Sequence, residues 1–174
     1  MILQNIFTLF AGITAFSAAV TSASRIPELK TARLTKAYLD AFERKDLDAL
    51  TNFTTEDAYF RSTLTVDGGP APLCHVSGRP AVIKYLSDVI DGFGKIKFVD
   101  VDISVTGDGK TSFVQATGDF TSADGTPYSN SYIFRFDWKD GKNSAFIEYT
   151  NPITFCNVFA PDDCQALIDS ICPH

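Results

Sequence analysis

Residues 95 to 151 decide the fold, and they read KIKFVDVDISVTGDGKTSFVQATGDFTSADGTPYSNSYIFRFDWKDGKNSAFIEYTN. Three Asp-Gly pairs, at residues 108–109, 124–125 and 140–141, divide this stretch at a constant interval of 16 residues. Asp-Gly between runs of β-branched and aromatic residues is typical of a tight hairpin turn, because both residues tolerate a positive φ angle. The stretch therefore predicts a meander of four long antiparallel strands.

Side chains alternate along a strand, so each predicted strand has two candidate faces. The third strand carries aromatic residues on one face: Tyr132, Phe134, Phe136 and Trp138. With even loops at Asp124 and Asp140, the same face also holds Phe113, Gln115, Thr117 and Asp119 from the second strand, and Ala145, Ile147, Tyr149 and Asn151 from the fourth. Glu148 then falls on the opposite face, at the surface or at an interface. An odd last loop would invert that assignment.

The first predicted strand carries an apolar row made of Val99, Val101, Ile103 and Val105. An odd loop at residues 107–109, with Gly109 in the left-handed region and a bulge beside it, brings this row to the aromatic face. We favour that register because burying each of these side chains is favourable by roughly 1.5–3 kcal/mol.

Polar residues interrupt the expected apolar face toward one end: Gln115, Thr117, Asp119, Asn130 and Asn151. Buried polar groups need hydrogen-bond partners, so these residues lie either at a solvated rim or in a pocket with an aromatic floor. The second arrangement is the usual composition of a small-molecule site.

The chain has 174 residues, of which 45% are hydrophobic, and this is enough for one well-filled domain. Its net charge of −6, without a cluster of lysine or arginine, argues against nucleic acid as a partner. We expect no metal site, because the two histidines, His75 and His174, are not spaced as ligands. No phosphate-binding glycine loop or other cofactor motif is present, and we expect a cofactor-free protein.

Residues 1–23 are typical of a secretory signal peptide, with an uncharged apolar run from Ile6 to Val20 and small residues before position 24. The alternative is a membrane anchor, for which the run is short; we expect no stable membrane span in the mature form. Four cysteines, an even number, and the glycosylation sequon at Asn52 agree with a secreted protein or one in the lumen of the secretory pathway.

Helices are predicted around residues 34–42, after Asp46, after Arg79-Pro80 and over 162–171. Pro152 and Pro161 are expected to break regular structure. A helix over 162–171 would separate Cys164 from Cys172 by about 12 Å, beyond the ~7 Å limit for a disulfide. Two pairings remain, Cys74–Cys172 with Cys156–Cys164, or Cys74–Cys164 with Cys156–Cys172. We expect residues 156–174 to form a disulfide-tethered tail after a domain of residues 24–155.

The order helix, helix, strand, helix, meander resembles the SnoaL-like polyketide cyclases and the nuclear-transport-factor-like superfamily, which includes ketosteroid isomerase and scytalone dehydratase. Two segments carry the resemblance: residues 38–63, with the run Asp40 to Leu50 followed by Tyr59-Phe60-Arg61-Ser62, and residues 132–152, ending Glu148-Tyr149-Thr150-Asn151-Pro152. The resemblance implies an α+β cone: a curved antiparallel sheet wrapped around N-terminal helices, with an internal apolar cavity.

The resemblance does not carry over a complete catalytic set. Phe42, Glu43 and Phe60 stand where scytalone dehydratase has a tyrosine, an aspartate and a tyrosine, and no counterpart of its histidine pair is present. Ser62 stands where ketosteroid isomerase has its general base. Asn151 occupies the place of the acidic residue of the SnoaL-like cyclases.

Asp119 and His75 are the candidate groups for proton transfer. A carboxylate on an aromatic face would have a raised pKa, and histidine titrates near neutrality. Each has a simpler interpretation, Asp119 as a solvated residue near a loop and His75 as a surface-loop residue. Aromatic and polar residues are the candidates for substrate binding: Tyr38, Phe60, Ser62, Gln115, Asn130, Tyr132, Phe134, Tyr149 and Asn151.

Three functions compete. The first is a cofactor-free isomerase, cyclase or dehydratase that acts by acid–base catalysis on a hydrophobic polyketide- or terpenoid-like molecule. The second is a secreted protein that binds an apolar ligand without chemistry. The third is an interaction module that forms a homodimer through the outer sheet face between Ile133 and Phe146.

Overall fold

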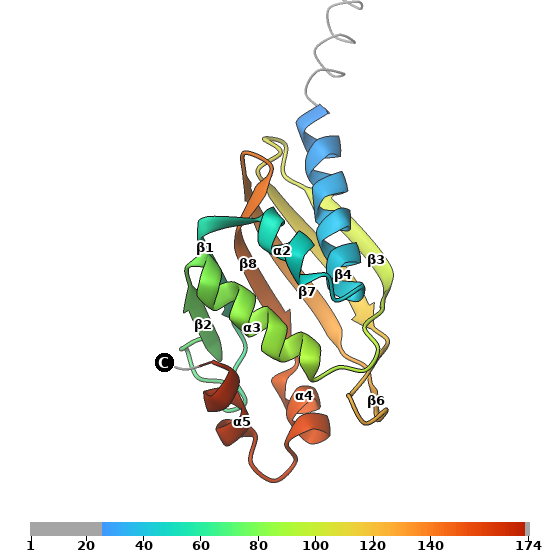
Figure 1. Ribbon diagram of the computed structural model, residues 1–174, viewed down its shortest axis with the longest axis vertical. Helices are drawn as coiled ribbons and strands as arrows, with labels where there is room; N and C mark the ends of the chain where they lie inside the picture. Colours follow the sequence, from blue (N-terminus) through green and yellow to red (C-terminus); the bar gives the residue numbers. More distant parts are fainter. Residues whose placement is uncertain (1–25, 173–174) are drawn as a thin grey trace, which may run out of the picture.

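The computed structural model describes residues 26–172 (Figure 1). The expected signal peptide lies outside the described residues. The first helix spans residues 26–43. The elements after it are α2 (Leu47–Phe53), β1 (Thr54–Ser62), β2 (Cys74–Ser77), α3 (Arg79–Asp91), β3 (Phe98–Val105), β4 (Thr111–Gly118), β5 (Phe120–Thr121), β6 (Pro127–Tyr128), β7 (Ser131–Lys139), β8 (Lys142–Thr150), α4 (Pro152–Phe159) and α5 (Cys164–Ile171).

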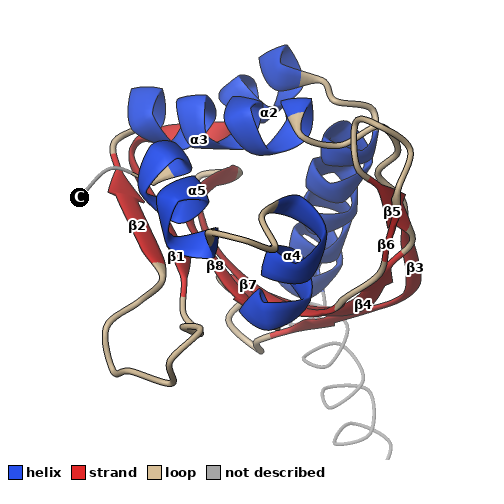
Figure 2. Cartoon of the chain, turned by 90° about the horizontal axis from the view of Figure 1, so that it is seen from below, coloured by secondary structure: helices blue, strands red, loops and turns tan. Residues whose placement is uncertain are grey.

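Six strands form one curved sheet in the order β2-β1-β8-β7-β4-β3, and β5 pairs with β6 in a separate ribbon. The predicted meander is confirmed, because β3, β4, β7 and β8 are neighbours and antiparallel. β1 joins β8 in parallel, the one parallel pair of this sheet. Figure 2 shows the sheet curving around the first helix, α2 and α3, while α4 and α5 lie at one end of it. The expected α+β cone is confirmed.

Local sequence explains where the helices begin. Asp46 caps α2 by accepting a hydrogen bond from the Ala49 backbone N–H at 2.9 Å. Pro80 lies in the first turn of α3, where no intrahelical N–H is needed. Pro152 likewise begins α4, and Asn151 caps it. Pro152 thus lies at the break between the end of β8 and the start of α4, and the domain boundary expected after residue 155 falls inside α4.

The first hairpin has an even loop rather than the expected odd one. Val105 pairs with Ser112, and Thr106 and Thr111 close the turn with a backbone hydrogen bond of 2.9 Å. Ile103 pairs with Val114, which pairs in turn with Phe134, so Ile103 does share the aromatic face. A bulge between Val99 and Asp102 turns Val99 to the outer face, opposite Thr117.

The connection from β4 to β7 is the reason that Ile103 and Val105 still share the aromatic face, whereas Val101, in the bulge, is 43% exposed. An odd number of residues, 118 to 130, separates the paired Thr117 and Ser131, and the Asp124-Gly125 turn lies within the β5–β6 ribbon. The aromatic face of β7 therefore continues in Val114 and Ala116. The prediction that Phe113, Gln115, Thr117 and Asp119 share this face is wrong.

The last hairpin has the expected two-residue turn, Asp140-Gly141, with both φ angles positive (53° and 80°). Asp137 pairs with Ala145 and Trp138 with Asn143, so Ser144 is an extra residue in β8. Beyond this bulge, each residue of β8 faces the side of the sheet opposite to the one predicted. Phe146, Glu148 and Thr150 consequently share the face of Phe136, Phe134 and Tyr132, whereas Ile147 and Tyr149 lie on the outer face.

Aromatic side chains fill most of the space between the sheet and the helices. Phe136 and Phe146 stack at 4.9 Å between ring centroids, and Phe60 stacks on Tyr85 of α3 at 4.2 Å. Tyr38 of the first helix packs edge-on against Phe146. No helix within residues 26–172 combines the length and apolar character needed to cross a membrane.

Candidate functional site

A cavity lies inside the cone, between the concave face of the sheet and the helices that cover it. The space that the centre of a water molecule can reach in it is about 80 Å³, several times what one buried water needs. Most of its lining is aromatic or aliphatic. The polar groups that reach it come from Tyr38, Ser62, Tyr85, Tyr128, Tyr132, Glu148 and Thr150.

Glu148 carries the only carboxyl group on the cavity wall among the described residues; the lining holds no lysine, arginine or histidine. On β8 it lies between Ser62 of β1 and Phe134 of β7. Burial among these side chains raises the pKa of Glu148 from 4.5 to about 7. Within residues 26–172, its carboxylate forms no ion pair. The group can therefore exchange a proton near neutral pH.

Two tyrosine hydroxyls form a pair on the same wall. The Tyr132 hydroxyl on β7 lies 3.3 Å from the Tyr128 hydroxyl on β6. Burial raises the pKa of both phenols, and the negative charge of Glu148 raises them further. Burial and the Glu148 charge also raise the pKa of the Tyr85 phenol on α3. The three phenols therefore stay protonated and lie within electrostatic reach of the carboxylate.

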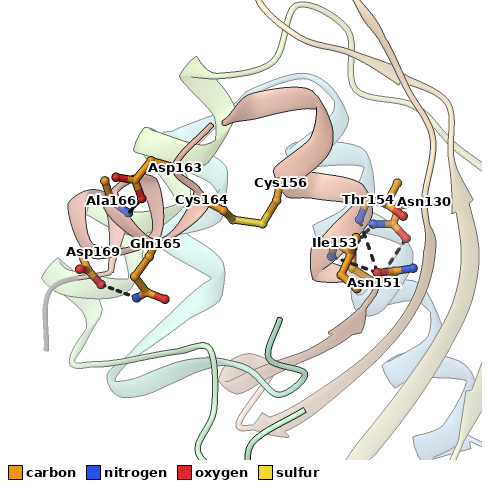
Figure 3. Close-up of a disulfide and its surroundings, with 10 residues drawn as sticks. All are labelled: Asn130, Asn151, Ile153, Thr154, Cys156, Asp163, Cys164, Gln165, Ala166 and Asp169. Atoms are coloured by element: carbon orange, nitrogen blue, oxygen red, sulfur yellow. Dashed lines mark hydrogen bonds between the residues drawn. A yellow bond between two sulfur atoms is a disulfide. The ribbon is translucent and has the colours of Figure 1, made fainter. Parts of the chain in front are cut away.

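Asn130 lies behind this pair, buried at the junction between β6 and β7. Its side-chain amide donates to the Tyr128 hydroxyl and to the Asn151 carbonyl, both at 2.8 Å. Figure 3 shows Asn130 beside Asn151, at the start of α4. Asn130 thus connects the hydroxyl pair to the helix that closes the end of the cavity.

Tyr38 contributes a fourth hydroxyl from the first helix. Its side chain is 1% exposed, and burial raises its pKa, although the nearby Thr54 hydroxyl offsets part of this effect. Among the described residues the Tyr38 hydroxyl has no well-aligned hydrogen-bond partner, and the Thr54 hydroxyl donates its own proton to the Leu50 carbonyl at 2.7 Å.

Two disulfides fix the helices that close the cavity. Cys74 pairs with Cys172, and Cys156 pairs with Cys164, the first of the two predicted arrangements. Cys156–Cys164 joins α4 to α5 (Figure 3). Cys74 and Cys172 belong to the cavity wall, together with Phe155, Ile168 and Ile171 from the two helices. Residues 152–172 are thus a cross-linked closure of the cavity.

The structure brings five of the residues predicted for substrate binding to the cavity wall: Tyr38, Phe60, Ser62, Tyr132 and Phe134. Asn130 contacts the wall through Tyr128. Gln115 is exposed and Tyr149 lies on the outer face of the sheet. Both were predicted to face inward from registers that the structure does not have. Asn151 is exposed, and its side chain caps α4 by accepting from Ile153 and Thr154 N–H groups.

Both residues predicted for proton transfer lie outside the cavity. Asp119 forms an exposed ion pair of 2.6 Å with Lys95. His75 is exposed on β2, where its imidazole lies 3.0 Å from the Ser77 hydroxyl. Asp119 was predicted to face the cavity from an incorrect register of β4 with β7. His75 points outward because its neighbour on β2, Cys74, points inward and side chains alternate along a strand. Within the described residues no three His, Cys, Asp or Glu side chains gather at metal-binding distance.

Glu148 is the residue that the sequence prediction missed. Its assignment to the surface followed from an even register for the whole last hairpin, and the Ser144 bulge invalidates that assumption. Shifting the register by one residue gives Phe146, Glu148 and Thr150 as the inward set, the alternative that an odd last loop would have produced. An isolated carboxylate on an aromatic face was the feature we sought at Asp119, which follows β4, two strands from β8 in the sheet.

The domain is thus an α+β cone around an apolar cavity whose wall carries one carboxyl group. The chain belongs to the SnoaL-like domain family, whose profile matches residues 35–145. No curated protein matches the chain.

Solved structures agree with the fold. A candidate isomerase from Bacillus subtilis superimposes with a TM-score of 0.67 at 21% identity, over 80% of this chain and 99% of that one. PrhC from Penicillium brasilianum gives 0.66 at 16% identity, over 85% and 99%. A phenazine biosynthesis-related protein from Pseudomonas aeruginosa gives 0.65 at 16% identity, over 77% and 83%.

Proposed function

We propose that the protein is a cofactor-free isomerase or cyclase that moves a proton on a neutral, hydrophobic small molecule, with Glu148 as the proton-transfer group. The observation that carries this proposal is the single carboxylate in the aromatic cavity, with a pKa of about 7. General acid–base catalysis is most effective when the pKa of the group lies near the working pH.

The surroundings of Glu148 favour a neutral substrate. An anionic substrate would find no cation on the wall and would be repelled by the ionised carboxylate. The phenols of Tyr85, Tyr128 and Tyr132 supply hydrogen-bond donors that suit an oxygen gaining negative charge, as a carbonyl does when a neighbouring C–H bond loses its proton. A polyketide- or terpenoid-like ketone has this chemistry. The name of the candidate isomerase from Bacillus subtilis supports the same reaction type.

Proton abstraction can be measured without knowing the natural substrate. Small neutral ketones, such as cyclohex-2-enone and 2-tetralone, are incubated with the protein in D₂O, and loss of the α-proton signal is followed by NMR. We expect Glu148→Gln to slow the exchange by roughly 10²–10⁴-fold. Asp119→Asn, a carboxylate removed from the outer surface, is the control and is expected to leave the rate unchanged.

A second candidate function is binding without chemistry, and the disulfide-fixed closure favours it because a sequestered ligand needs an enclosed site. The same experiment separates the two functions. A carrier would bind these ketones, seen as line broadening in their NMR spectra, without accelerating exchange. Exchange that persists in Glu148→Gln would contradict the assignment of this carboxylate.

We also propose that the chain matures in the secretory pathway. Its two disulfides are of the kind that form in an oxidising compartment. Signal-peptide cleavage after residue 23 and a glycan on Asn52 would both appear in the intact mass of the protein purified from a eukaryotic secretion host. Asn52 is exposed in α2 and leaves room for a glycan.

A homodimer through the outer sheet face is a further part of this proposal. Phe113 on β4 and Ile133 on β7 are 41% and 43% exposed there. Phe146, expected at the same surface, instead lies 6% exposed beside the cavity and takes no part. Sedimentation velocity of Ile133→Glu against the unmodified protein tests this, since a charge at the centre of an apolar interface is expected to give a monomer.

A further inference from the structure

The direction of the Asn130 carboxamide is fixed by the backbone around it. Its oxygen accepts from the Ser131 N–H at 2.9 Å and from the Asn151 N–H at 3.4 Å. Turning the amide over would place its oxygen against the Asn151 carbonyl and its NH₂ group against two N–H donors. The NH₂ group therefore faces the Tyr128 oxygen, and the hydroxyl of Tyr128 must accept that hydrogen bond.

This arrangement leaves one phenolic proton unused. Tyr128 and Tyr132 together own two hydroxyl protons, but they share only one O···O contact, of 3.3 Å. Because Asn130 has no free acceptor for Tyr128, one proton lies between the two oxygens and the other has no partner within the described residues. Both rings belong to the cavity wall, so this second proton can be donated only toward the cavity.

We propose that Asn130 is a positioning residue that makes the Tyr128–Tyr132 pair a one-proton donor for the oxygen of a neutral, flat, carbonyl- or phenol-bearing ring. Asn130 itself does not touch the substrate; it acts through Tyr128. The inference extends the proposed function, because it assigns the substrate oxygen to the hydroxyl pair and leaves the C–H bond to Glu148.

The shape and charge of the cavity agree with this ligand class. Tyr132 stacks with Phe134 at 5.1 Å and with Phe120 at 5.7 Å, so the donor belongs to a row of stacked rings. A flat ring can extend this row while its oxygen meets the hydroxyl pair. Glu148 lies opposite Phe134 across the β7–β8 pair and lines the same cavity, and its charge acts on both phenols.

The probe for the donor is 4-nitrophenolate, an aromatic oxyanion whose absorbance reports binding. It is titrated against Glu148→Gln, which removes the repelling charge and any proton transfer. Adding Asn130→Asp reverses the polarity facing Tyr128, and adding Asn130→Ser removes the carboxamide without adding charge. We expect each to weaken binding about tenfold or more, the effect of losing one hydrogen bond to a charged oxygen.

The control variants separate positioning from general damage. Gln115→Glu makes the same amide-to-carboxylate change at an exposed side chain on the outer face of β4, away from the cavity. We expect it to leave nitrophenolate affinity unchanged. In a Tyr128→Phe background, the Asn130 variants should have no further effect, because the group through which Asn130 acts is absent.

Two results would overturn the inference: unchanged affinity in Asn130→Ser, or an equal loss with and without the Tyr128 hydroxyl. Neither depends on catalysis, because every variant carries Glu148→Gln. Failure of the ketone exchange experiment would therefore reject the proposed reaction while leaving the hydrogen-bond donor assignment intact.

Discussion

Ser62 and Glu148 lie directly opposite each other across the single parallel strand pair of the sheet, β1 with β8. Both side chains reach the cavity. The resemblance to ketosteroid isomerase placed that family's general base at about Ser62, where this chain has a hydroxyl. In this chain the carboxyl group is that of Glu148, on the strand next to Ser62. The two positions are paired, so the carboxyl group reaches the same region of the cavity.

The raised pKa of Glu148 predicts that this residue destabilises the fold at high pH. The folded protein holds the Glu148 proton up to about pH 7, whereas the unfolded chain releases it near 4.5. Between these values the folded state binds more protons, so its stability falls as pH rises. A shift from 4.5 to 7 corresponds to up to about 3 kcal/mol.

Urea unfolding of the protein and of Glu148→Gln measures this effect. We expect nearly equal free energies of unfolding at pH 4, and a variant more stable by up to about 3 kcal/mol at pH 8. Asp119→Asn, on the surface, should show no comparable pH-dependent gain. A Glu148→Gln variant that is equally stable at both pH values would show that the carboxylate is solvated.

The same pKa predicts the pH profile of α-proton exchange. Only the ionised form of Glu148 accepts a proton, so the rate should rise about tenfold per pH unit below 7 and level off above it. The NMR exchange experiment at pH 5, 6, 7 and 8 provides the profile. A rate that continues to rise to pH 9 would point to hydroxide rather than to the carboxylate.

The sequence predicts the meander because its Asp-Gly turns are local features. Gly109 and Gly141 do adopt positive φ angles, and Asp140-Gly141 forms the tight turn that its residue types favour. Which face of the sheet each side chain takes is harder to predict, because it depends on bulges and loop lengths. The predicted loop at residues 107–110 and the predicted connection from β4 to β7 were each wrong by one residue. The two errors together leave Ile103 on the predicted face, whereas Asp119 is affected only by the second and lies on the other face.

The candidate site was predictable only in part for the same reason. Tyr38, Phe60 and Phe134 follow from apolar periodicity, which one extra residue elsewhere does not change. Glu148 depends on the Ser144 bulge, where the Asn143 side chain replaces ladder hydrogen bonds by donating to the Asp137 and Ala145 carbonyls. No general pattern in a single sequence marks such a bulge, so the inward carboxylate was assigned to the surface.

The two disulfides are expected to contribute unequally to stability. Cys74–Cys172 closes a loop of 98 residues and Cys156–Cys164 one of 8. Loop-closure entropy gives roughly 4.7 kcal/mol for the long loop and roughly 2.5 kcal/mol for the short one. Replacing each pair by alanines and measuring urea unfolding tests the order. A larger loss from the 156–164 pair would mean that strain or packing outweighs chain entropy.

Gly118 sets the position of Tyr132 and so links the sheet backbone to the hydroxyl pair. A Cβ atom on Gly118 would lie 2.8 Å from Cε2 of Tyr132 and 3.1 Å from Cζ of Phe120, closer than packed atoms tolerate. Gly118→Ala is therefore expected to displace the Tyr132 ring and to destabilise the protein by about 1–3 kcal/mol.

The displaced ring should also move its hydroxyl away from Tyr128, so Gly118→Ala should weaken 4-nitrophenolate binding in the Glu148→Gln background. Gly107→Ala is the matched control, because its nearest contact for a new Cβ, with Glu28, is 3.9 Å away and its φ angle is not positive. If Gly118→Ala lowers stability but not affinity, the Tyr132 hydroxyl keeps its place despite the added methyl group, and the ring adjusts by moving its other edge.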